Sequence, residues 1–290
     1  METIHTVEWM KQVAREARAQ ERILGLVPTM GALHEGHLSL IREAKKDCSP
    51  TVVSIFVNPK QFSPSEDFQK YPRRVERDHG LLEDLGVDYL FAPTAEEMYP
   101  HGFRTAVLVE GLSELLEGRS RPGHFRGVTT VVLKLFEIVQ PRFAYFGRKD
   151  AQQVRIIQQM TSDLELDTQI VVCPIVREPD GLALSSRNAY LNGDDRRSAT
   201  ALYRGLDAVR HEIGAGERDA IRLLTALRRV IEAEPKVALD YAEIVDAETL
   251  EPVVSLRRTC LVLLAAFVGG VRLIDNALVE QAGDSFKVTL

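Results

Sequence analysis

Cysteine is scarce in this sequence: its 290 residues include only Cys48, Cys173 and Cys260, which lie far apart. An odd number of widely spaced cysteines does not form a disulfide framework, so we expect a reducing compartment, the cytoplasm. Long apolar runs are lacking too. No stretch approaches about 18 uninterrupted apolar residues, and residues 1–12 carry no apolar core of signal-peptide length. We therefore expect no membrane span and no membrane partner.

An excess of positive charge is also lacking. The formal net charge is -6, whereas a protein that grips nucleic acid needs clustered Lys and Arg to contact phosphates. Nucleic acid is therefore not an expected partner. The length and an apolar content of 45% predict a globular protein with one large domain or two modest ones.

The most informative stretch runs from Ile23 to His37 and reads ILGLVPTMGALHEGH. Its apolar start predicts a short buried strand that Pro28 ends, and an amphipathic helix over about 38–44 follows. A strand that turns into a helix so quickly is typical of the first unit of a nucleotide-binding α/β sheet. Unpaired backbone N–H groups and the positive dipole end of this helix predict an anion site, which Gly31 and Gly36 let a ligand approach closely.

His34 and His37 stand three apart, so once the helix has begun they share a face and point at the same anion. Two imidazole donors on one phosphate stabilise the charge that develops during phosphoryl or nucleotidyl transfer. The alternative is that they are ordinary surface histidines near a helix start. Zinc fits less well, because the metalloprotease motif spaces its histidines four apart and the remaining histidines lack ligand spacing.

A run rich in β-branched residues, from Thr51 to Val57, predicts a strand buried on both faces that stops at Asn58-Pro59. It delivers Asn58 and Gln61 to the carboxyl end of the strand, where ligands bind in open α/β sheets. The alternative is that these two side chains merely satisfy the backbone of the turn.

Strands and helices then alternate, which predicts parallel strands with right-handed crossovers. Helices are predicted over about 5–20, 73–85 and 128–139 and from 151, and strands over 87–91, 105–109, 143–146 and 168–173. An irregular basic loop over 119–127 has three interpretations: it binds anions, lines a subunit contact, or is simply solvated.

A second turn repeats the pattern of the first, with glycine at a strand end, charged residues and then a helix start. Lys149 is the candidate cation for a phosphate, Asp150 caps the helix or binds a ribose hydroxyl, and Gln153 faces the same mouth one turn later. Farther on, Ser-Ser-Arg at 185–187 offers hydroxyl and guanidinium donors suited to a polyphosphate.

From about residue 194 the pattern changes. Two helices are predicted over roughly 195–213 and 218–232, followed by strands over 239–245, 260–268 and 271–273, with Gly269-Gly270 as a turn. The predicted fold is therefore α/β, with a Rossmann-type parallel-sheet domain over 1–176 and a smaller α+β domain over 177–290.

Five segments occur in order along the chain: VPTMGALHEGH (27–37), IFVNPKQF (55–62), RPGHFRGV (121–128), FGRKDAQQ (146–153) and LSSRN (184–188). Together they resemble the pantothenate synthetase family, the pantoate–β-alanine ligases, over nearly the whole chain. The resemblance implies a cytidylyltransferase-like, HIGH-type nucleotidyltransferase that is usually a homodimer. It implies that ATP and pantoate form pantoyl adenylate and pyrophosphate, and that β-alanine then attacks to give pantothenate and AMP, with Mg²⁺ assisting.

The resemblance also implies roles for individual residues. His34 and His37 would be transition-state donors, with His37 the proton donor, and Lys149 would neutralise charge at the α-phosphate. Gln61 and Gln153 would bind pantoate, and Gln61 would also meet β-alanine. The implied ATP-binding residues are Met30, Gly31, Ala32, Leu33, His34, Glu35, Gly36, His37, Gly147, Arg148, Lys149, Asp150, Val176, Leu184, Ser185, Ser186 and Arg187. The residues from 177 onward would form a lid.

Several points stay open at this level. The carboxylate that helps place Mg²⁺ is either Asp78 or Asp88. The chain departs from the family pattern at Ala151, often aromatic, at Leu184, often Met, and at Arg148, an added charge without an assigned target. Rival functions are another small-molecule adenylyltransferase of the superfamily, a metal-dependent hydrolase centred on the two histidines, and a nucleotide sensor without turnover.

Overall fold

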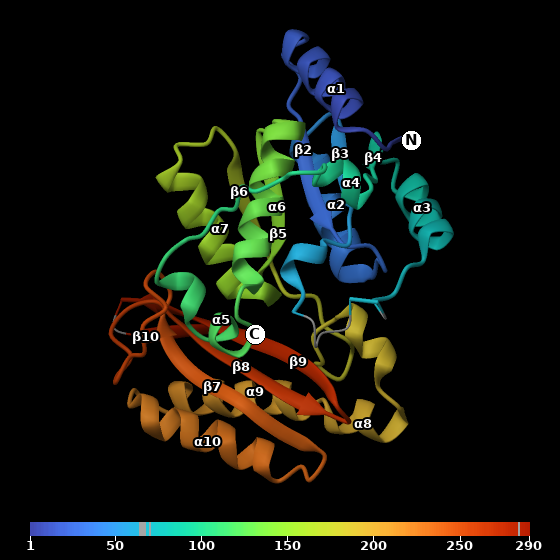
Figure 1. Ribbon diagram of the computed structural model, residues 1–290. Helices are drawn as coiled ribbons and strands as arrows, with labels where there is room; N and C mark the ends of the chain where they lie inside the picture. Colours follow the sequence, from blue (N-terminus) through green and yellow to red (C-terminus); the bar gives the residue numbers. More distant parts are fainter. Residues whose placement is uncertain (64–67, 70, 284) are drawn as a thin grey trace. The chain divides into compact units, whose positions relative to one another are not determined.

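The structure is a computed structural model that describes residues 1–63, 68–69, 71–283 and 285–290. The chain forms two compact units (Figure 1). The first comprises Met1–Arg148 with Gln152–Pro174, and the second comprises Lys149–Ala151 with Ile175–Leu290. The chain therefore passes into the second unit for three residues before it completes the first.

The first unit is built on a six-stranded sheet in the order β1-β4-β3-β2-β5-β6. All of its strand pairs are parallel, which confirms the predicted Rossmann-type class. The strands are β1 (Glu2–Ile4), β2 (Gly25–Thr29), β3 (Thr51–Ile55), β4 (Tyr89–Phe91), β5 (Phe143–Gly147) and β6 (Gln169–Cys173).

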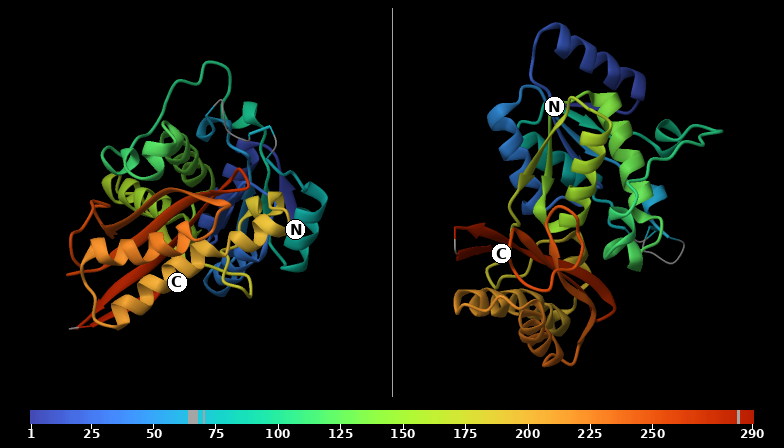
Figure 2. Two further views of the ribbon diagram at one scale, coloured as in Figure 1. Left: turned by 90° about the horizontal axis from the view of Figure 1, so that it is seen from below. Right: turned by 90° about the vertical axis from the view of Figure 1, so that its left-hand side faces the viewer.

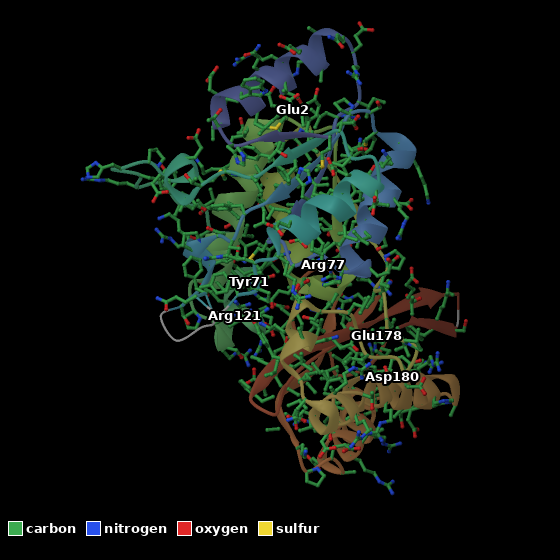
Figure 3. The ribbon with its side chains drawn as sticks, turned by 90° about the vertical axis from the view of Figure 1, so that its right-hand side faces the viewer. Glu2, Tyr71, Arg77, Arg121, Glu178 and Asp180 are labelled. Atoms are coloured by element: carbon green, nitrogen blue, oxygen red, sulfur yellow. The ribbon has the colours of Figure 1, made fainter. Side chains whose placement is uncertain are left out.

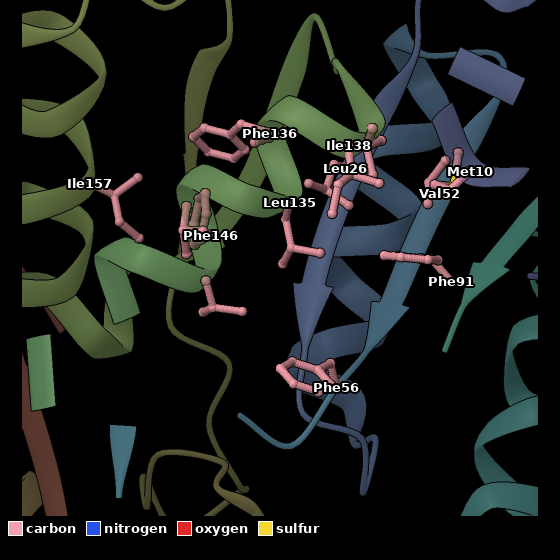
Figure 4. Close-up of a cluster of buried hydrophobic side chains, with 14 of the residues drawn as sticks. Met10, Leu26, Val52, Phe56, Phe91, Leu135, Phe136, Ile138, Phe146 and Ile157 are labelled. Atoms are coloured by element: carbon pink, nitrogen blue, oxygen red, sulfur yellow. The ribbon is translucent and has the colours of Figure 1, made fainter. Parts of the chain in front are cut away.

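The longer helices of this unit cover both faces of the sheet (Figures 1 and 2). The helices of the unit are α1 (Val7–Ala19), α2 (Glu35–Asp47), α3 (Val75–Asp84), α4 (Ala95–Met98), α5 (Glu117–Ser120), α6 (His124–Val139) and α7 (Ala151–Asp163). Because side chains alternate along a strand, Leu26 belongs to the core that α1, α6 and α7 share, where it lies near Ile138 and Leu135 (Figure 4), whereas Val27 belongs to the core of α2 and α3. Burial on both faces explains why these strands are almost entirely apolar.

The order of the strands places a topological switch at β2. The chain runs from β2 to β3 and β4 on one side, then returns to β5 on the other side and continues to β6. The crossover helices α2 and α7 accordingly pack into different cores. In open α/β sheets, ligands bind at the carboxyl ends of the strands beside such a switch.

The second unit contains an antiparallel sheet in the order β10-β9-β8-β7, as expected for the predicted α+β part. Its elements are α8 (Gly193–Ser198), α9 (Ala201–Gly214), α10 (Ala220–Glu232), β7 (Val237–Asp246), β8 (Cys260–Val268), β9 (Val271–Ala282) and β10 (Ser285–Thr289). Apolar residues of α9 and α10 share one core with β7 to β9. The predicted Gly269-Gly270 turn is confirmed: Val268 pairs with Val271, and both glycines have positive φ.

Three predictions about the first unit are wrong. Pro28 lies inside β2, where it pairs with Ser54 of β3. On its other side β2 pairs with β5 only at Gly25 and Leu26, so the N–H that Pro28 lacks would have had no partner on β5. The described residues 105–109 form no strand, since hydroxyl groups of α6 bond the backbone of Val107 instead. The predicted loop over 119–127 is largely helical, because α6 begins at His124, directly after the left-handed Gly123.

Predictions about the second unit also need correction. The helix expected over 195–213 is two helices, α8 and α9. The strand expected to end at Leu273 continues to Ala282, and β10 was not predicted. The polar pair Asp275 and Asn276 made a buried strand look unfavourable at this point of the sequence. Asp275 is nevertheless buried, because the two terminal nitrogens of Arg177 bind its carboxylate at 2.7 and 2.9 Å.

All three cysteines are free and buried. Cys48 and Cys173 belong to the first unit and Cys260 to the second. Burial raises the pKa of the Cys173 and Cys260 thiols to about 11. Across the residues that the structure describes, no helix has the length and apolar character needed to cross a membrane.

Candidate active site

The turn after β2 adopts an unusual backbone conformation that a distant carboxylate holds in place. Gly31 and Ala32 have φ of 79° and 51°, in the left-handed region. The backbone N–H of Ala32 donates to Asp78 Oδ2 at 2.7 Å, and that of Leu33 donates to Asp78 Oδ1 at 2.9 Å. Asp78 lies on α3 and is only 1% exposed. Its carboxylate therefore fixes the turn from a helix 46 positions away in sequence.

The prediction that this turn offers unpaired backbone N–H groups is wrong for most of its residues. Besides the two bonds to Asp78, the N–H of Gly31 donates to Thr29 Oγ1, that of His34 to His37 Nδ1, and that of Gly36 to His34 Nδ1. The turn thus uses its N–H groups to hold its own shape. An anion bound at this turn would therefore meet mainly side-chain donors and the helix dipole.

The two histidines form a pair at the start of α2. His34 is the N-cap and His37 the third helical residue, in a reciprocal capping box, and their ring centroids are 4.1 Å apart. The predicted proximity of the rings is confirmed. Because Nδ1 of each ring accepts a backbone N–H, the hydrogen of each neutral imidazole lies on Nε2. Each ring therefore carries an N–H donor without needing a positive charge.

Glu35, between the histidines, is turned toward Arg42 on the next turns of α2. The guanidinium donates to the carboxylate at 2.5 and 3.1 Å, and these hydrogen bonds lower the pKa of Glu35. The carboxylate stays ionised at neutral pH. This orientation leaves the imidazoles as the donor groups of the turn.

Gln61 lies beside the same turn. It ends the short helix η1 (Pro59–Gln61), and its Nε2 is 3.1 Å from Met30 Sδ. Asn58 is fully buried, and its Oδ1 accepts the N–H of Lys60 at 3.2 Å. The structural alternative for Asn58 is therefore supported, whereas the amide nitrogen of Gln61 faces the histidine turn.

The segment RPGHFRGV packs against the backbone at Gln61. His124 Nδ1 is 2.9 Å from the Gln61 carbonyl oxygen, and its Nε2 is 3.1 Å from the guanidinium of Arg121, labelled in Figure 3. Because arginine only donates, Nε2 accepts and the Nδ1–H donates to the carbonyl. His124 thus supports the backbone at Gln61, a role that sequence reasoning did not assign.

Gly127 allows α6 and η1 to approach each other. A Cβ built on Gly127 would lie 2.2 Å from the Lys60 carbonyl oxygen and 2.6 Å from Gln61 Cα. We expect Gly127→Ala to lower the free energy of unfolding by about 1–3 kcal/mol, since backbone must shift to admit the methyl group. Thermal unfolding followed by circular dichroism measures this. Gly80→Ala on α3, where the added Cβ meets nothing within 4 Å, is the control; an equal effect of the two changes would contradict the packing argument.

The predicted residue Gln153 is the third residue of α7 and is half-buried. Its neighbour Gln152 is 3% exposed and holds the segment 112–117. Gln152 Oε1 accepts the N–H of Glu117 at 2.9 Å, and Nε2 donates to the carbonyl oxygens of Leu112 and Leu115 at 2.9 and 2.8 Å. The adjacent glutamines at 152 and 153 could have indicated a structural role for Gln152, but the sequence prediction gave a role only to Gln153.

The remaining predicted residues lie in two groups. Gly147 ends β5 and Arg148 begins the helix η3 (Arg148–Asp150), both in or next to the sheet of the first unit. In the second unit, the Lys149 carbonyl oxygen accepts a hydrogen bond from Asn276 Nδ2 at 2.9 Å. The Lys149 Nζ atom lies 3.9 Å from Asp150 Oδ1. Asn276 therefore holds the backbone of the candidate cation.

The segment 184–187 also belongs to the second unit. The N–H of Leu184 donates to the carbonyl oxygen of Val176 at 3.0 Å, so these two predicted residues are neighbours. Ser185 caps the helix η4 (Ser186–Tyr190) by accepting the N–H of Arg187 on its hydroxyl. Ser186 and Arg187 thus start a helical turn.

The carboxylates proposed for Mg²⁺ have other partners. Both oxygens of Asp78 accept backbone N–H groups, and Asp88 Oδ2 accepts the N–H of Thr51 at 2.8 Å. Within the described ranges, no group of three or more His, Cys, Asp or Glu side chains is arranged to hold a metal ion. Both carboxylates are thus engaged by backbone N–H groups, and a part for Asp78 or Asp88 in placing Mg²⁺ beside ATP stays a prediction.

Comparison with known proteins adds to this geometry. The family model Pantoate-beta-alanine ligase matches residues 2–278. The pantothenate synthetase of Caldicellulosiruptor saccharolyticus is 51% identical over 280 residues, covering 97% of this chain and all of that protein. That of Thermotoga neapolitana is 53% identical over 278 residues, covering 96% of this chain and 99% of the relative.

Solved structures agree. The pantothenate synthetase of Thermus thermophilus has a TM-score of 0.91 and 46% identity, and the match covers 95% of this chain and 98% of that one. A pantoate-beta-alanine ligase from Francisella tularensis, complexed with beta-gamma ATP and beta-alanine, has a TM-score of 0.78 and 37% identity, covering 95% and 97%. Since the family model and these relatives span nearly the whole chain, the chain belongs to the pantoate–β-alanine ligase (pantothenate synthetase) family.

Proposed function

We propose that this protein catalyses the ATP-dependent condensation of pantoate with β-alanine, giving pantothenate, AMP and pyrophosphate through pantoyl adenylate. The observation that carries the proposal is the arrangement after β2: two imidazole donors 4.1 Å apart at a helix N-terminus, beside the turn that Gln61 contacts through Met30. Membership of the family supports this choice of substrates.

In the first step, a carboxylate oxygen of pantoate attacks the α-phosphorus of ATP, and the bond from that phosphorus to the bridging oxygen of pyrophosphate breaks. Negative charge shifts onto the leaving pyrophosphate. The Nε2–H groups of His34 and His37 donate hydrogen bonds to phosphate oxygens as this charge develops, with His37 at the position that the family resemblance gives to the proton donor, and the dipole of α2 adds to the stabilisation. Lys149 acts on the α-phosphate.

In the second step, the amine of β-alanine attacks the acyl carbon of pantoyl adenylate. The carbon–oxygen bond to AMP breaks, the amide forms, and the proton that the amine loses passes to water. Gln61 and Gln153 hold pantoate, and Gln61 also meets β-alanine. The nucleophiles of both steps come from the substrates, so the protein needs to supply position and charge stabilisation rather than an activated serine or cysteine.

The remaining features of the proposal concern ATP and its setting. Met30–His37, Gly147–Asp150, Val176 and Leu184–Arg187 bind the nucleotide, and residues 177–290 act as a lid. Mg²⁺ accompanies the ATP phosphates, whose charge it neutralises when bound. We also propose a cytoplasmic homodimer; the buried free cysteines are compatible with a reducing compartment, and sedimentation analysis tests the dimer.

Following pyrophosphate and AMP release from ATP and Mg²⁺ tests the function. With pantoate alone, we expect a burst of pyrophosphate of about one equivalent per site, because a closed site protects the adenylate from water. Sustained AMP formation is expected only after β-alanine is added. Omitting Mg²⁺ is expected to abolish the burst.

Three other results would lead to different functions. Pyrophosphate release that requires a carboxylate other than pantoate indicates a different adenylyltransferase of the superfamily. ATP binding without any turnover indicates a sensor. Activity that is lost with chelators that spare Mg²⁺ indicates the metal-dependent hydrolase.

A further inference from the structure

The side-chain amide of Gln61 has a defined orientation. Its Oε1 accepts a hydrogen bond from Asn58 Nδ2 at 3.0 Å, which leaves Nε2 on the side of Met30 and the histidine turn. In the reverse orientation two donors would face each other. The amide therefore presents N–H toward the turn only while Asn58 directs its own NH₂ group at Gln61.

The orientation of Asn58 is set in turn by its other partners. The Tyr99 hydroxyl donates to Asn58 Oδ1 at 2.8 Å, and the N–H of Lys60 donates to the same oxygen at 3.2 Å. On the opposite side, Asn58 Nδ2 also donates to the Gly127 carbonyl oxygen at 3.0 Å. All four contacts agree on one orientation of a fully buried amide.

Tyr99 follows the short helix α4, and its ring is held on several sides. The Phe103 ring packs edge-on with centroids 5.1 Å apart, Phe56 lies at 6.1 Å, and the Lys60 ammonium lies 4.9 Å from the ring centroid. Burial raises the pKa of Tyr99, so its hydroxyl remains protonated and can donate at neutral pH.

We propose that Tyr99 is a positioning residue for substrate recognition: its hydroxyl orients Asn58, and Asn58 orients Gln61 so that the amide N–H faces the substrate. This inference rests on the proposed function, in which Gln61 binds pantoate and β-alanine. Without the hydroxyl, Asn58 keeps the Lys60 N–H on its oxygen and the Gly127 carbonyl at its NH₂ group, but the preferred orientation of the two amides is held less firmly. A reversed Gln61 would direct a carbonyl oxygen at an oxygen-rich substrate.

Tyr99→Phe removes only the hydroxyl. We expect the KM for pantoate to rise about tenfold, the scale of one buried hydrogen bond, while the KM for ATP changes less than about twofold. Tyr89→Phe, on β4 of the same unit, is the matched control and should leave both constants unchanged. Equal changes in the two KM values, or none for pantoate, would overturn the inference.

A double-mutant comparison separates this role from a general structural one. In a Gln61→Met background, where no amide remains to be oriented, Tyr99→Phe should change the KM for pantoate less than about twofold. A second tenfold rise there would show that Tyr99 acts independently of Gln61, against the proposal. If Tyr99→Phe does not fold, Asn58→Asp replaces it: an oxygen then faces Gln61 Oε1, and the KM for pantoate should rise at least as much.

The failure of the inference and the failure of the proposed function give different results. Wild-type protein without pantoate-dependent pyrophosphate release overturns the proposed function, and the substrate assignment in this inference falls with it. An active wild-type protein whose Tyr99→Phe variant retains its KM for pantoate overturns the role of Tyr99 alone.

Discussion

Replacing His37 with alanine is expected to lower kcat for pantoate-dependent pyrophosphate release by about 10²–10³-fold, the loss typical for one donor to a transition-state charge. The side chain also accepts the N–H of His34 in the capping box, so the variant should lose about 0.5–2 kcal/mol of stability as well. Single-turnover measurements of pyrophosphate release with saturating ATP and pantoate give the kinetic part.

Two further variants separate catalysis from capping. His37→Asn keeps a short acceptor near the position of Nδ1 but no donor at the position of Nε2, so stability should be retained and activity lost. His37→Gln places an amide N–H near the position of Nε2 and should recover part of the rate. His211→Ala, at an exposed position on α9, is the control. Wild-type activity in His37→Asn would show that the imidazole only caps the helix.

The largest structural effect is expected for Asp78→Ala. It leaves the N–H groups of Ala32 and Leu33 buried without their acceptor, which should lower the free energy of unfolding by about 2–5 kcal/mol. The left-handed turn that precedes His34 then loses its support, so activity should fall even under conditions in which the variant remains folded. Urea unfolding by circular dichroism and the pyrophosphate assay measure the two effects on the same samples.

The conservative variant refines this prediction. Asp78→Asn keeps one acceptor oxygen but turns an NH₂ group toward the second backbone N–H, so its stability should lie between those of the wild type and Asp78→Ala. Asp84→Ala, exposed on the same helix, should have little effect. An Asp78→Ala protein that is as stable as the Asp84→Ala protein would contradict the structural role of Asp78.

Much of the fold could be predicted because its signals are local. The helical spacing of Met10, Val13 and Ala17 and the β-branched run at Thr51 are properties of short windows, and both elements are present. The end of β9 was missed for a non-local reason: Asp275 is compatible with a buried strand only because Arg177, 98 positions away, binds its carboxylate. No window around residue 275 contains that partner.

The candidate site shows the same division. The closeness of His34 and His37 follows from their spacing on one helix and was predicted. Asp78 accepts the N–H groups of the turn only because α3 packs against the turn. Residue spacing does not reveal this packing, and the sequence prediction therefore treated these N–H groups as unpaired. The contacts of Tyr99 with Asn58 and of His124 with Gln61 depend on the tertiary arrangement of α4, α6 and η1. Polar partners distant in sequence carry no periodic signal.

The buried thiols allow the unfolding of each unit to be followed by their reaction with alkylating reagents. With pKa values near 11, Cys173 and Cys260 hold only about 10⁻⁴ of their population as thiolate at pH 7, and burial denies alkylating reagents access as well. Exposure by unfolding restores an ordinary thiol, so alkylation speeds up sharply. Because Cys173 lies in the first unit and Cys260 in the second, peptide mass spectrometry after a brief alkylation pulse gives a separate opening rate for each unit, without an added dye or tag.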